Sequence, residues 1–394
     1  LPHMPRTHTT IVTGIDIGTS YIKVVVGERA QHDAYPSIRA VVTVENNGMR
    51  RGYIDSTSDV TRSIERALSL ASKQSGYPIT RVVVGVHGLG LSSIQGTGHA
   101  VITRADSQVT TLDTNRAIQN SEDTLGEQKN QKIIHVIPQK WKLDNKDVLA
   151  KVLGLIGGKL EVKTLFVTYP EQQIEELHAI FESLGVDVDD TIASPIATSL
   201  CVLSKKERTI GSCVIDIGAE TTTMVVYEHS VPLLVHTIQI GTNDITHDIA
   251  LGLKVSIEDA EKMKRGTYDG TVSKRKIDEI IRARTTDIFE LVDAQLRKVH
   301  RSGLLPAGTI ILGGGSNQKL VLEIAKDILR IPVTTESQEL TTITKGKLKD
   351  PSLGVAFGLA LLQSDTSSNR TGSARETLSQ SFQAVIQFFK QFLP

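Results

Sequence analysis

The sequence predicts an α/β protein of two related lobes, each with a mixed β-sheet flanked by helices. The main observation is a phrase that occurs twice. TGIDIGTSYIKVVVGE, at 13–28, aligns without a gap with CVIDIGAETTTMVVYE, at 213–228. Internal repetition of this kind is typical of a duplicated architecture. The length of 394 residues allows two or more domains.

The first copy of the phrase opens the first lobe. Two β-branched runs over 11–27 flank a Gly-Thr-Ser turn, which predicts a strand, a tight turn and a second strand. Another apolar run, 40–44, predicts a third strand. Apolar residues return at helical spacing over 58–72, and 81–86 predicts a buried strand.

A segment of different composition interrupts this lobe. It is rich in Gly and Thr after 88, contains a polar helix around 114–123, and ends with the strand KIIHVIPQKWKLD. The earlier pattern resumes at LEVKTLFVTYP, which a helix over 171–184 follows. We therefore expect an inserted subdomain over 86–162.

The second lobe begins with a helix over 193–203, directly before the second copy of the phrase. The chain is then helical and charged over 243–303. GTIILGGGS, at 308–316, predicts a strand that runs into a glycine turn, and a helix of small residues covers 353–362.

Composition excludes some classes of function. The 44 basic residues balance the 44 acidic ones, so no global field attracts nucleic acid, and we expect no nucleic-acid partner. Cys201 and Cys213 lack the spacing of a zinc site or a disulfide framework, which favours a reducing cytosol. No secretory signal and no apolar run long enough to span a bilayer is evident.

Each copy of the repeated phrase is suited to phosphate binding. A turn of the type Asp-x-Gly directs backbone N–H groups to its concave side, where they bind phosphate oxygens. Asp16 and Asp216 precede the turns and are candidates for holding Mg²⁺ through water, because Mg²⁺ keeps part of its hydration shell. Two such hairpins would hold a polyphosphate from both sides. The other candidate phosphate ligands are Gly18, Thr19, Ser20, Lys23, Gly218, Ala219, Thr221 and Thr222.

A third glycine-rich element follows a strand in the second lobe. Its residues are Gly313, Gly314, Gly315 and Ser316, and glycine permits close approach of backbone to a flat ring or a ribose.

These elements, in this order, resemble those of the actin/heat-shock chaperone/sugar kinase superfamily. The two hairpins are similar to its two phosphate motifs, the sequence ASPIA at 193–197 to its first connecting helix, and the glycine turn to its adenosine motif. In that superfamily an Ala-Glu-x-x-Lys helix contacts the adenine-ribose side, a position that Glu261 and Lys264 occupy here. The resemblance implies an actin-like ATPase fold and implies ATP and Mg²⁺ as cofactors.

Within the superfamily the chain resembles the FtsA family of bacterial cell-division proteins. The residues that carry the resemblance are HVIPQ at 135–139 and LEVK at 160–163, which close and follow the FtsA-type inserted subdomain 1C. The resemblance implies a division into subdomains and a tail. These are 1A at 10–85 plus 163–192, 1C (SHS2-like) at 86–162, 2A at 193–242 plus 304–363, 2B at 243–303, a linker at 364–374 and an amphipathic helix at 375–394.

The second phosphate turn departs from the family pattern. Where the family usually has Gly-Gly-Gly-Thr, this chain has Gly218-Ala219-Glu220-Thr221. Glu220 is the candidate catalytic residue: its carboxylate could orient water or sit on Mg²⁺, or it could weaken hydrolysis by repelling the triphosphate. ATP binding with at most weak ATPase activity is therefore expected.

The tail predicts an amphipathic helix. Placed at 100° per residue, its apolar residues fall on one side and its glutamines on the other. An interfacial membrane helix fits this pattern, and docking on the chain itself or on a partner groove is the alternative. FtsA carries a membrane-targeting helix in this position. The apolar face consists of Leu378, Phe382, Val385, Ile386, Phe388, Phe389, Phe392 and Leu393.

The long basic helix RKIDEIIRARTTDIFELVDAQLRKVHRSG predicts a partner surface. In FtsA this helix lies in subdomain 2B, which receives the acidic C-terminal peptide of the tubulin homologue FtsZ. Arg284 falls in the family's Pro-Arg position and is the first candidate, because an arginine fork suits a carboxylate. The further candidates are Arg282, Arg297 and Arg301.

Three functions compete. The first is an actin-like, ATP-binding protein that polymerises and anchors the FtsZ ring to the cytoplasmic face of the membrane at the division site, with other division proteins as partners. The second is a PilM-like protein of type IV pilus assembly, which the wording DIGAETT also resembles. The third is a small-molecule kinase of the sugar-kinase branch, which would need a carboxylate base beside a substrate hydroxyl.

Overall fold

The computed structural model describes residues 9–363, apart from 31, 32, 150, 269, 271, 319 and 349. The linker predicted at 364–374 and the amphipathic helix predicted at 375–394 lie outside the described residues and stay predictions.

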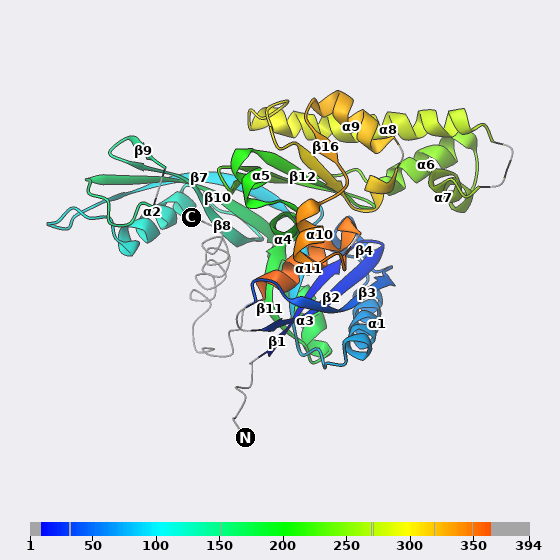
Figure 1. Ribbon diagram of the computed structural model, residues 1–394, viewed down its shortest axis with the longest axis horizontal. Helices are drawn as coiled ribbons and strands as arrows, with labels where there is room; N and C mark the ends of the chain where they lie inside the picture. The colour runs from blue at the N-terminus through cyan, green and yellow to red at the C-terminus, as the bar shows by residue number, and fades with distance from the viewer. Residues whose placement is uncertain are drawn as a thin grey trace, which may run out of the picture.

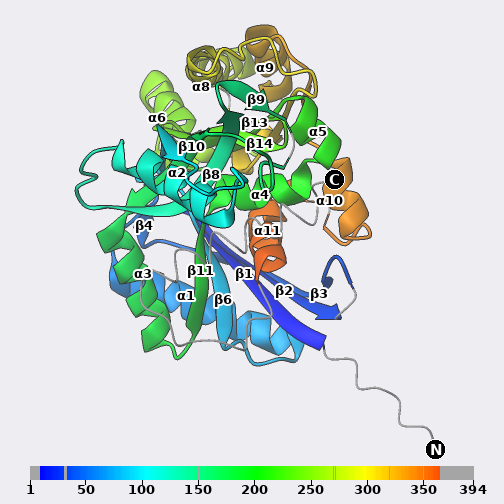
Figure 2. The same ribbon diagram turned by 90° about the vertical axis from the view of Figure 1, so that its left-hand side faces the viewer.

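The first lobe is built on a five-stranded sheet in the order β11-β6-β1-β2-β3. β1 pairs antiparallel with β2 and parallel with β6, and β3 and β11 form the edges. α1 and α3 lie beside this sheet (Figures 1 and 2). The elements are β1 (Thr9–Ile17), β2 (Tyr21–Ala30), β3 (Ser37–Glu45), a small hairpin of β4 (Met49–Arg50) and β5 (Tyr53–Ile54), α1 (Thr57–Ser75), β6 (Arg81–Val86), α3 (Glu171–Ser183) and β11 (Asp187–Ala193).

The second lobe repeats this topology. Its sheet runs β14-β13-β12-β15-β16, with the same antiparallel and parallel pairings in the same places. The repeated phrase therefore marks a duplicated sheet, as predicted. The elements are β12 (Ser212–Ile217), β13 (Thr222–Glu228), β14 (Val231–Ile238), β15 (Thr309–Leu312), the 3₁₀ helix η1 (Gly314–Asn317), α9 (Val321–Leu329) and β16 (Val333–Thr334).

Two apolar helices lie between the lobes. α4 (Ser194–Val202) and α11 (Gly354–Leu362) contact each other, and every residue of both is buried. Gly358 permits this contact, because a Cβ there would overlap the Ala197 carbonyl. Figure 2 shows both helices between the two sheets. Three short helices complete this region: α5 (Lys205–Ile210), α10 (Gln338–Ile343) and the 3₁₀ helix η2 (Pro351–Leu353).

The inserted subdomain is a four-stranded sheet in the order β7-β10-β8-β9, with one helix packed on it. It extends sideways from the body at the left of Figure 1. Gly96 and Gly98 of β7 allow the helix to approach, since a Cβ at either would overlap its backbone. The elements are β7 (Ser92–Val101), α2 (Thr111–Asp123), β8 (Gln131–Leu143), β9 (Lys146–Val148) and β10 (Lys159–Pro170).

The structure corrects the predicted end of this insertion at 162. β10 is one continuous strand that pairs with β7 as far as Thr168 and with β8 as far as Pro170. Residues 163–170 therefore belong to the inserted sheet and not to the sheet of subdomain 1A.

The charged segment 243–303 contains three helices among its described residues, at the upper right of Figure 1. Its helices are α6 (Thr242–Leu253), α7 (Ile257–Arg265) and α8 (Lys274–Lys298). A small apolar core of its own joins them, centred on Ile249 and Ile281.

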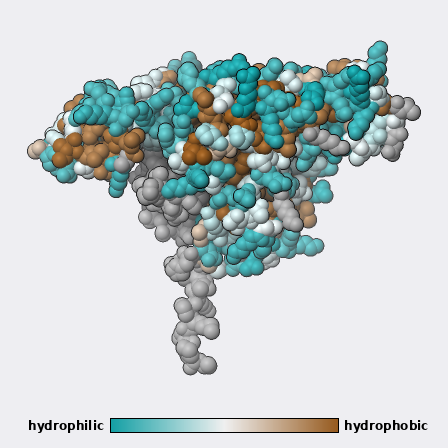
Figure 3. All heavy atoms as spheres, turned by 45° about the horizontal axis from the view of Figure 1, so that its top comes forward, coloured by the Kyte–Doolittle hydropathy of each residue, from teal (hydrophilic) through white to brown (hydrophobic). Residues whose placement is uncertain are grey.

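The surface carries apolar side chains at the outer end of the inserted subdomain, at the left of Figure 3. Val101, Leu112, Leu149 and Ile156 are each more than half exposed: their exposed fractions are 59%, 58%, 99% and 71%. Among the described helices, none combines the length and apolar content that crossing a membrane requires.

Candidate nucleotide site between the lobes

A large cleft, with a volume of about 1570 Å³, contains most of the predicted site residues. Both hairpin turns, the glycine turn and the start of subdomain 2B line it. Thirteen predicted residues are on its walls: Asp16, Gly18, Thr19, Ser20, Lys23, Asp216, Gly218, Ala219, Thr221, Glu261, Lys264, Gly313 and Gly314.

The first hairpin turn is closed by a hydrogen bond from Gly18 N to Tyr21 O of 2.9 Å. Asn46, which directly follows β3, holds the turn in place. Its backbone N–H donates to Ser20 O at 2.9 Å and its side-chain amide donates to Gly18 O at 2.8 Å. Asn46 is buried and also lines the cleft, and the sequence analysis missed it. The feature of the sequence that could have indicated Asn46 is its position directly after a strand.

The second turn has the same closing bond, from Gly218 N to Thr221 O at 2.9 Å. The start of α6 holds it: Thr242 N donates to Gly218 O at 2.9 Å and Asn243 N donates to Ala219 O at 2.7 Å. Ala219 is not in the positive-φ region, so the alanine that replaces a family glycine fits this turn without strain.

Asp16 and Asp216 approach the cleft from opposite lobes. Burial raises the pKa of the Asp216 carboxyl; the Lys23 ammonium opposes that shift and the Asp16 carboxylate adds to it. Lys23 Nζ donates to Ser352 O at 3.0 Å. Within the described residues, no three His, Cys, Asp or Glu side chains gather into a metal-binding group. Two carboxylates without further protein ligands suit Mg²⁺ that retains water.

The glycine turn lies against the second hairpin. Gly313 has φ +80°, and a Cβ there would overlap Asp216 Oδ1. Gly314 faces open space, whereas Gly315 packs on Ile217 and Thr242. Ser316 Oγ donates to Gly313 O at 2.8 Å, so this hydroxyl stabilises the turn and does not line the cleft.

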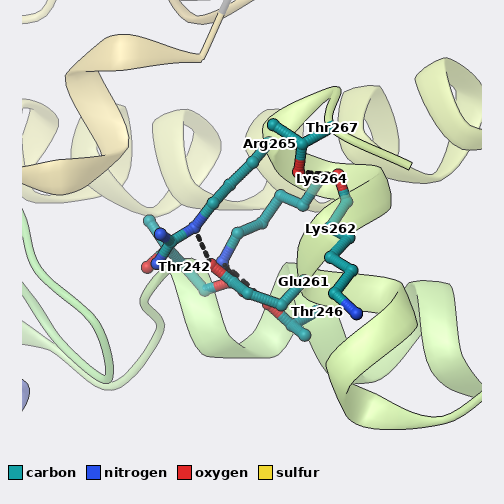
Figure 4. Close-up of polar contacts among 7 residues, drawn as sticks. All are labelled: Thr242, Thr246, Glu261, Lys262, Lys264, Arg265 and Thr267. Carbon is teal, nitrogen blue, oxygen red and sulfur yellow. Dashed lines mark hydrogen bonds and ion pairs between the residues drawn. The ribbon is translucent and has the colours of Figure 1, made fainter. Parts of the chain in front are cut away.

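Lys264 and Glu261 form a partly buried polar cluster on α7 (Figure 4). Lys264 Nζ lies 2.6 Å from Glu261 Oε2 and donates to Thr246 Oγ1 at 2.7 Å and Thr242 O at 3.1 Å. Burial raises the pKa of Glu261, but hydrogen bonds from Lys264, Thr246 and Arg265 outweigh it and bring the pKa to about 2. Since Thr242 also holds the second turn, this cluster connects α7 with the second hairpin turn.

Four predicted residues are not on the cleft walls: Glu220, Thr222, Gly315 and Ser316. Thr222 Oγ1 donates to Ile240 O at 2.8 Å within the second lobe. The Glu220 carboxylate accepts a hydrogen bond of 2.5 Å from Arg51 N in the first lobe. The cleft walls also include residues that were not predicted to act there, among them His87 and Ser194.

The arginines predicted to bind a partner peptide all have acidic neighbours. Arg282 Nη2 lies 2.9 Å from Glu323, Arg284 Nε 2.7 Å from Asp248, Arg297 Nη2 2.5 Å from Asp293, and Arg301 Nη2 2.5 Å from Glu228. At a helical rise of 1.5 Å per residue, Arg284 and Arg297 are roughly 20 Å apart. The four arginines therefore do not form one cluster. Arg301, which follows α8, pairs with Glu228 at the end of β13.

Comparisons with known proteins agree with this architecture. Residues 213–358 match the family profile "Cell division protein FtsA", and residues 90–168 match "SHS2 domain inserted in FTSA". FtsA of Bacillus subtilis is 28% identical over 371 residues, which cover 89% of this chain and 82% of the relative. FtsA of Pseudomonas aeruginosa is 25% identical over 391 residues, with coverage of 92% and 93%.

Among solved structures, the PilM-PilN type IV pilus biogenesis complex has a TM-score of 0.63 at 19% identity, covering 89% of this chain and 97% of that chain. The ethanolamine utilization protein EutJ from Carboxydothermus hydrogenoformans has a TM-score of 0.53 at 14% identity, covering 89% of each chain. At these identities the likeness shows the fold alone.

The duplicated lobes, the two connecting helices and the cleft between the hairpins define an actin-like ATPase fold. Both family profiles and the relatives identify the family within this fold. The chain belongs to the FtsA family of cell-division proteins. Membership implies a role at the division site, with division proteins as partners.

Proposed function

We propose that this chain binds ATP with Mg²⁺ in the cleft between its lobes. The observation that carries the proposal is the convergence of both hairpin turns, Lys264 and the Gly313 turn on one cleft. Backbone N–H groups of the turns would bind phosphate oxygens, and Asp16 and Asp216 would hold Mg²⁺ through water. The bound metal would neutralise phosphate charge.

Two further observations fit a nucleotide. Ser194 lines the cleft, and its Oγ is buried without a hydrogen-bond partner among the described residues, so a ligand that reaches this hydroxyl would supply the missing partner. Gly314 faces open space and has no side chain, which lets a ribose or ring approach the backbone of the turn.

We further propose that the chain polymerises and tethers the FtsZ ring to the cytoplasmic membrane. The acidic FtsZ peptide would bind near Arg284 in subdomain 2B, and the tail at 375–394 would insert in the lipid interface. One such helix binds reversibly, and many helices on one filament bind far more strongly through avidity. ATP would favour the closed, filament-forming state if it binds that state more tightly.

Vesicle co-sedimentation tests the tether. The full chain and a chain ending at Thr371 are compared, each with and without ATP·Mg²⁺. We expect only the full chain to pellet, and to pellet more completely with ATP. If both chains stay in the supernatant under every condition, the tail is a docking helix and the tether proposal is wrong.

A further inference from the structure

Glu220 forms a contact between the two lobes at the rim of the cleft. It lies in the turn between β12 and β13, and its Oε2 accepts a hydrogen bond of 2.5 Å from Arg51 N in the turn between β4 and β5. The two residues are 169 positions apart in the chain. In the repeat alignment Glu220 corresponds to Ser20 of the first lobe, whose side chain is too short for such a reach.

The acceptor side of this contact is held firmly. Bonds from Thr242 and Asn243 fix the backbone of the turn just before Glu220. Gly241 packs so closely that a Cβ there would overlap Ala219 O, which leaves no room for the turn to shift toward α6. The carboxylate is therefore presented to the first lobe from a rigid base.

The donor side is equally constrained. Arg51 and Gly52 both have positive φ, 52° and 86°, which is the geometry of a tight hairpin turn. Gly52 packs against Gly88 so that a Cβ on either would overlap the other, and Arg51 O accepts a bond from Leu89 N at 3.1 Å. The Arg51 N–H remains directed at the second lobe.

The same turn is bonded to the inserted subdomain. Tyr169, a buried residue of β10, donates its hydroxyl to Gly52 O at 2.8 Å. A short series of contacts therefore runs from the inserted sheet through Tyr169 and the 51–52 turn to Glu220. It ends beside the phosphate turn of the second lobe.

We infer that Glu220 is a positioning residue that latches the two lobes together through Arg51 N–H, and that Tyr169 links this latch to the inserted subdomain. Opening the cleft separates the two turns and breaks the bond, so the latch favours the closed form. The same bond directs the carboxylate toward Arg51 N–H, and neither residue is on the cleft walls. The effect of the latch on nucleotide binding rests on the proposed function. The contact itself can be tested without nucleotide.

Hydrogen exchange at the Arg51 amide reports the latch directly. In the nucleotide-free full chain we expect Glu220→Ala to accelerate this exchange at least tenfold, and Glu220→Gln, which keeps an acceptor oxygen, to accelerate it less. Tyr169→Phe keeps the ring and removes only the hydroxyl, and we expect a smaller acceleration. The matched control Glu45→Gln removes a charge from an exposed carboxylate at the same cleft and should leave Arg51 exchange unchanged.

A second readout follows the lobes themselves. Spin labels at Lys73→Cys on α1 and Lys326→Cys on α9 occupy exposed positions of opposite lobes, while Cys201 and Cys213 are buried. We expect a longer and broader distance distribution in Glu220→Ala. Unchanged Arg51 exchange or an unchanged distribution in Glu220→Ala would overturn the latch, and unchanged exchange in Tyr169→Phe would remove the link to the insertion. Failure of every variant and of the parent chain to bind ATP would instead overturn the proposed nucleotide function.

Discussion

Arg284 of α8 binds Asp248 of α6 through two hydrogen bonds, from Nε to Oδ2 at 2.7 Å and from Nη2 to Oδ1 at 3.0 Å. The guanidinium also donates to Asp287 at 3.3 Å. The fork that was predicted to receive an acidic peptide is therefore already paired with a carboxylate of its own subdomain. A peptide carboxylate would have to share the fork or displace Asp248.

This pairing predicts opposite effects of two substitutions on the proposed binding of an acidic FtsZ peptide. Arg284→Ala should weaken binding about tenfold or more, because a charge-assisted hydrogen bond contributes about 1.5–3 kcal/mol. Asp248→Asn should strengthen binding, since it frees the guanidinium from a competing charge. Fluorescence anisotropy with a labelled peptide measures both. Arg275→Ala removes the same charge from an exposed position of α8 and should have little effect; equal losses in Arg275→Ala and Arg284→Ala would show that only the general charge matters.

The Gly313 turn predicts a backbone effect on both stability and nucleotide binding. Gly313→Ala introduces a Cβ that overlaps Asp216 Oδ1 at a φ of +80°, and strain of this kind costs about 1–3 kcal/mol. We expect a lower free energy of unfolding and at least a tenfold weaker ATP affinity. Gly314→Ala, which faces open space, should keep the parent's unfolding free energy within about 0.5 kcal/mol. Urea titration and calorimetry measure the two quantities, and equal stabilities of the two variants would contradict the role of Gly313.

The Lys264 cluster predicts a selective loss of ATP affinity. Lys264→Met removes the ammonium that joins Glu261, Thr246 and Thr242, and with it the support of the second phosphate turn. We expect at least a tenfold weaker affinity for ATP. Lys262→Met changes the same residue type on the same helix, but Lys262 is half-exposed and pairs with Glu258 at 3.0 Å, so its effect should be less than about twofold. Comparable losses in the two variants would mean that Lys264 acts only through general charge.

His135 predicts a dependence of stability on pH. Its Nε2 accepts a hydrogen bond from Ala193 N at 2.9 Å, and burial lowers the pKa of His135 from 6.5 to about 4. The fold thus requires the neutral ring, which an unfolded chain protonates below pH 6.5. The contribution is fully present above that pH and is lost as the pH falls toward 4. By linkage, the stability lost between pH 7.5 and pH 4.5 amounts to roughly 2–3 kcal/mol.

The corresponding measurement is the free energy of unfolding in urea at pH 7.5 and pH 4.5. His135→Gln keeps an acceptor without a titrating ring, so its difference between the two pH values should be smaller than the parent's by about 2–3 kcal/mol. His178 and His236 also have pKa values lowered by burial and act in the same direction in both chains. His99→Gln changes an exposed histidine of the inserted sheet and should retain the parent's pH dependence. A parental pH dependence in His135→Gln would contradict this assignment.

Most of the fold could be predicted from local pattern. The repeated hairpins, the helix over 58–72 and the strand at 81–86 follow from periodicity and turn residues, and the duplicated sheet order confirms the repeat. The end of the insertion could not be predicted in this way. β10 is one continuous strand, and its sequence does not say which neighbours it pairs with.

The sequence by itself determined the two hairpin turns, the glycine turn and their order, because each depends on residues adjacent in the chain. Only the tertiary structure decided what the side chains at these turns do. Glu220 is bonded to Arg51, Lys23 to the carbonyl of Ser352, and Arg284 to Asp248, over separations of 169, 329 and 36 residues. Such contacts depend on how the lobes and helices pack, and local periodicity carries no information about a partner so far along the chain.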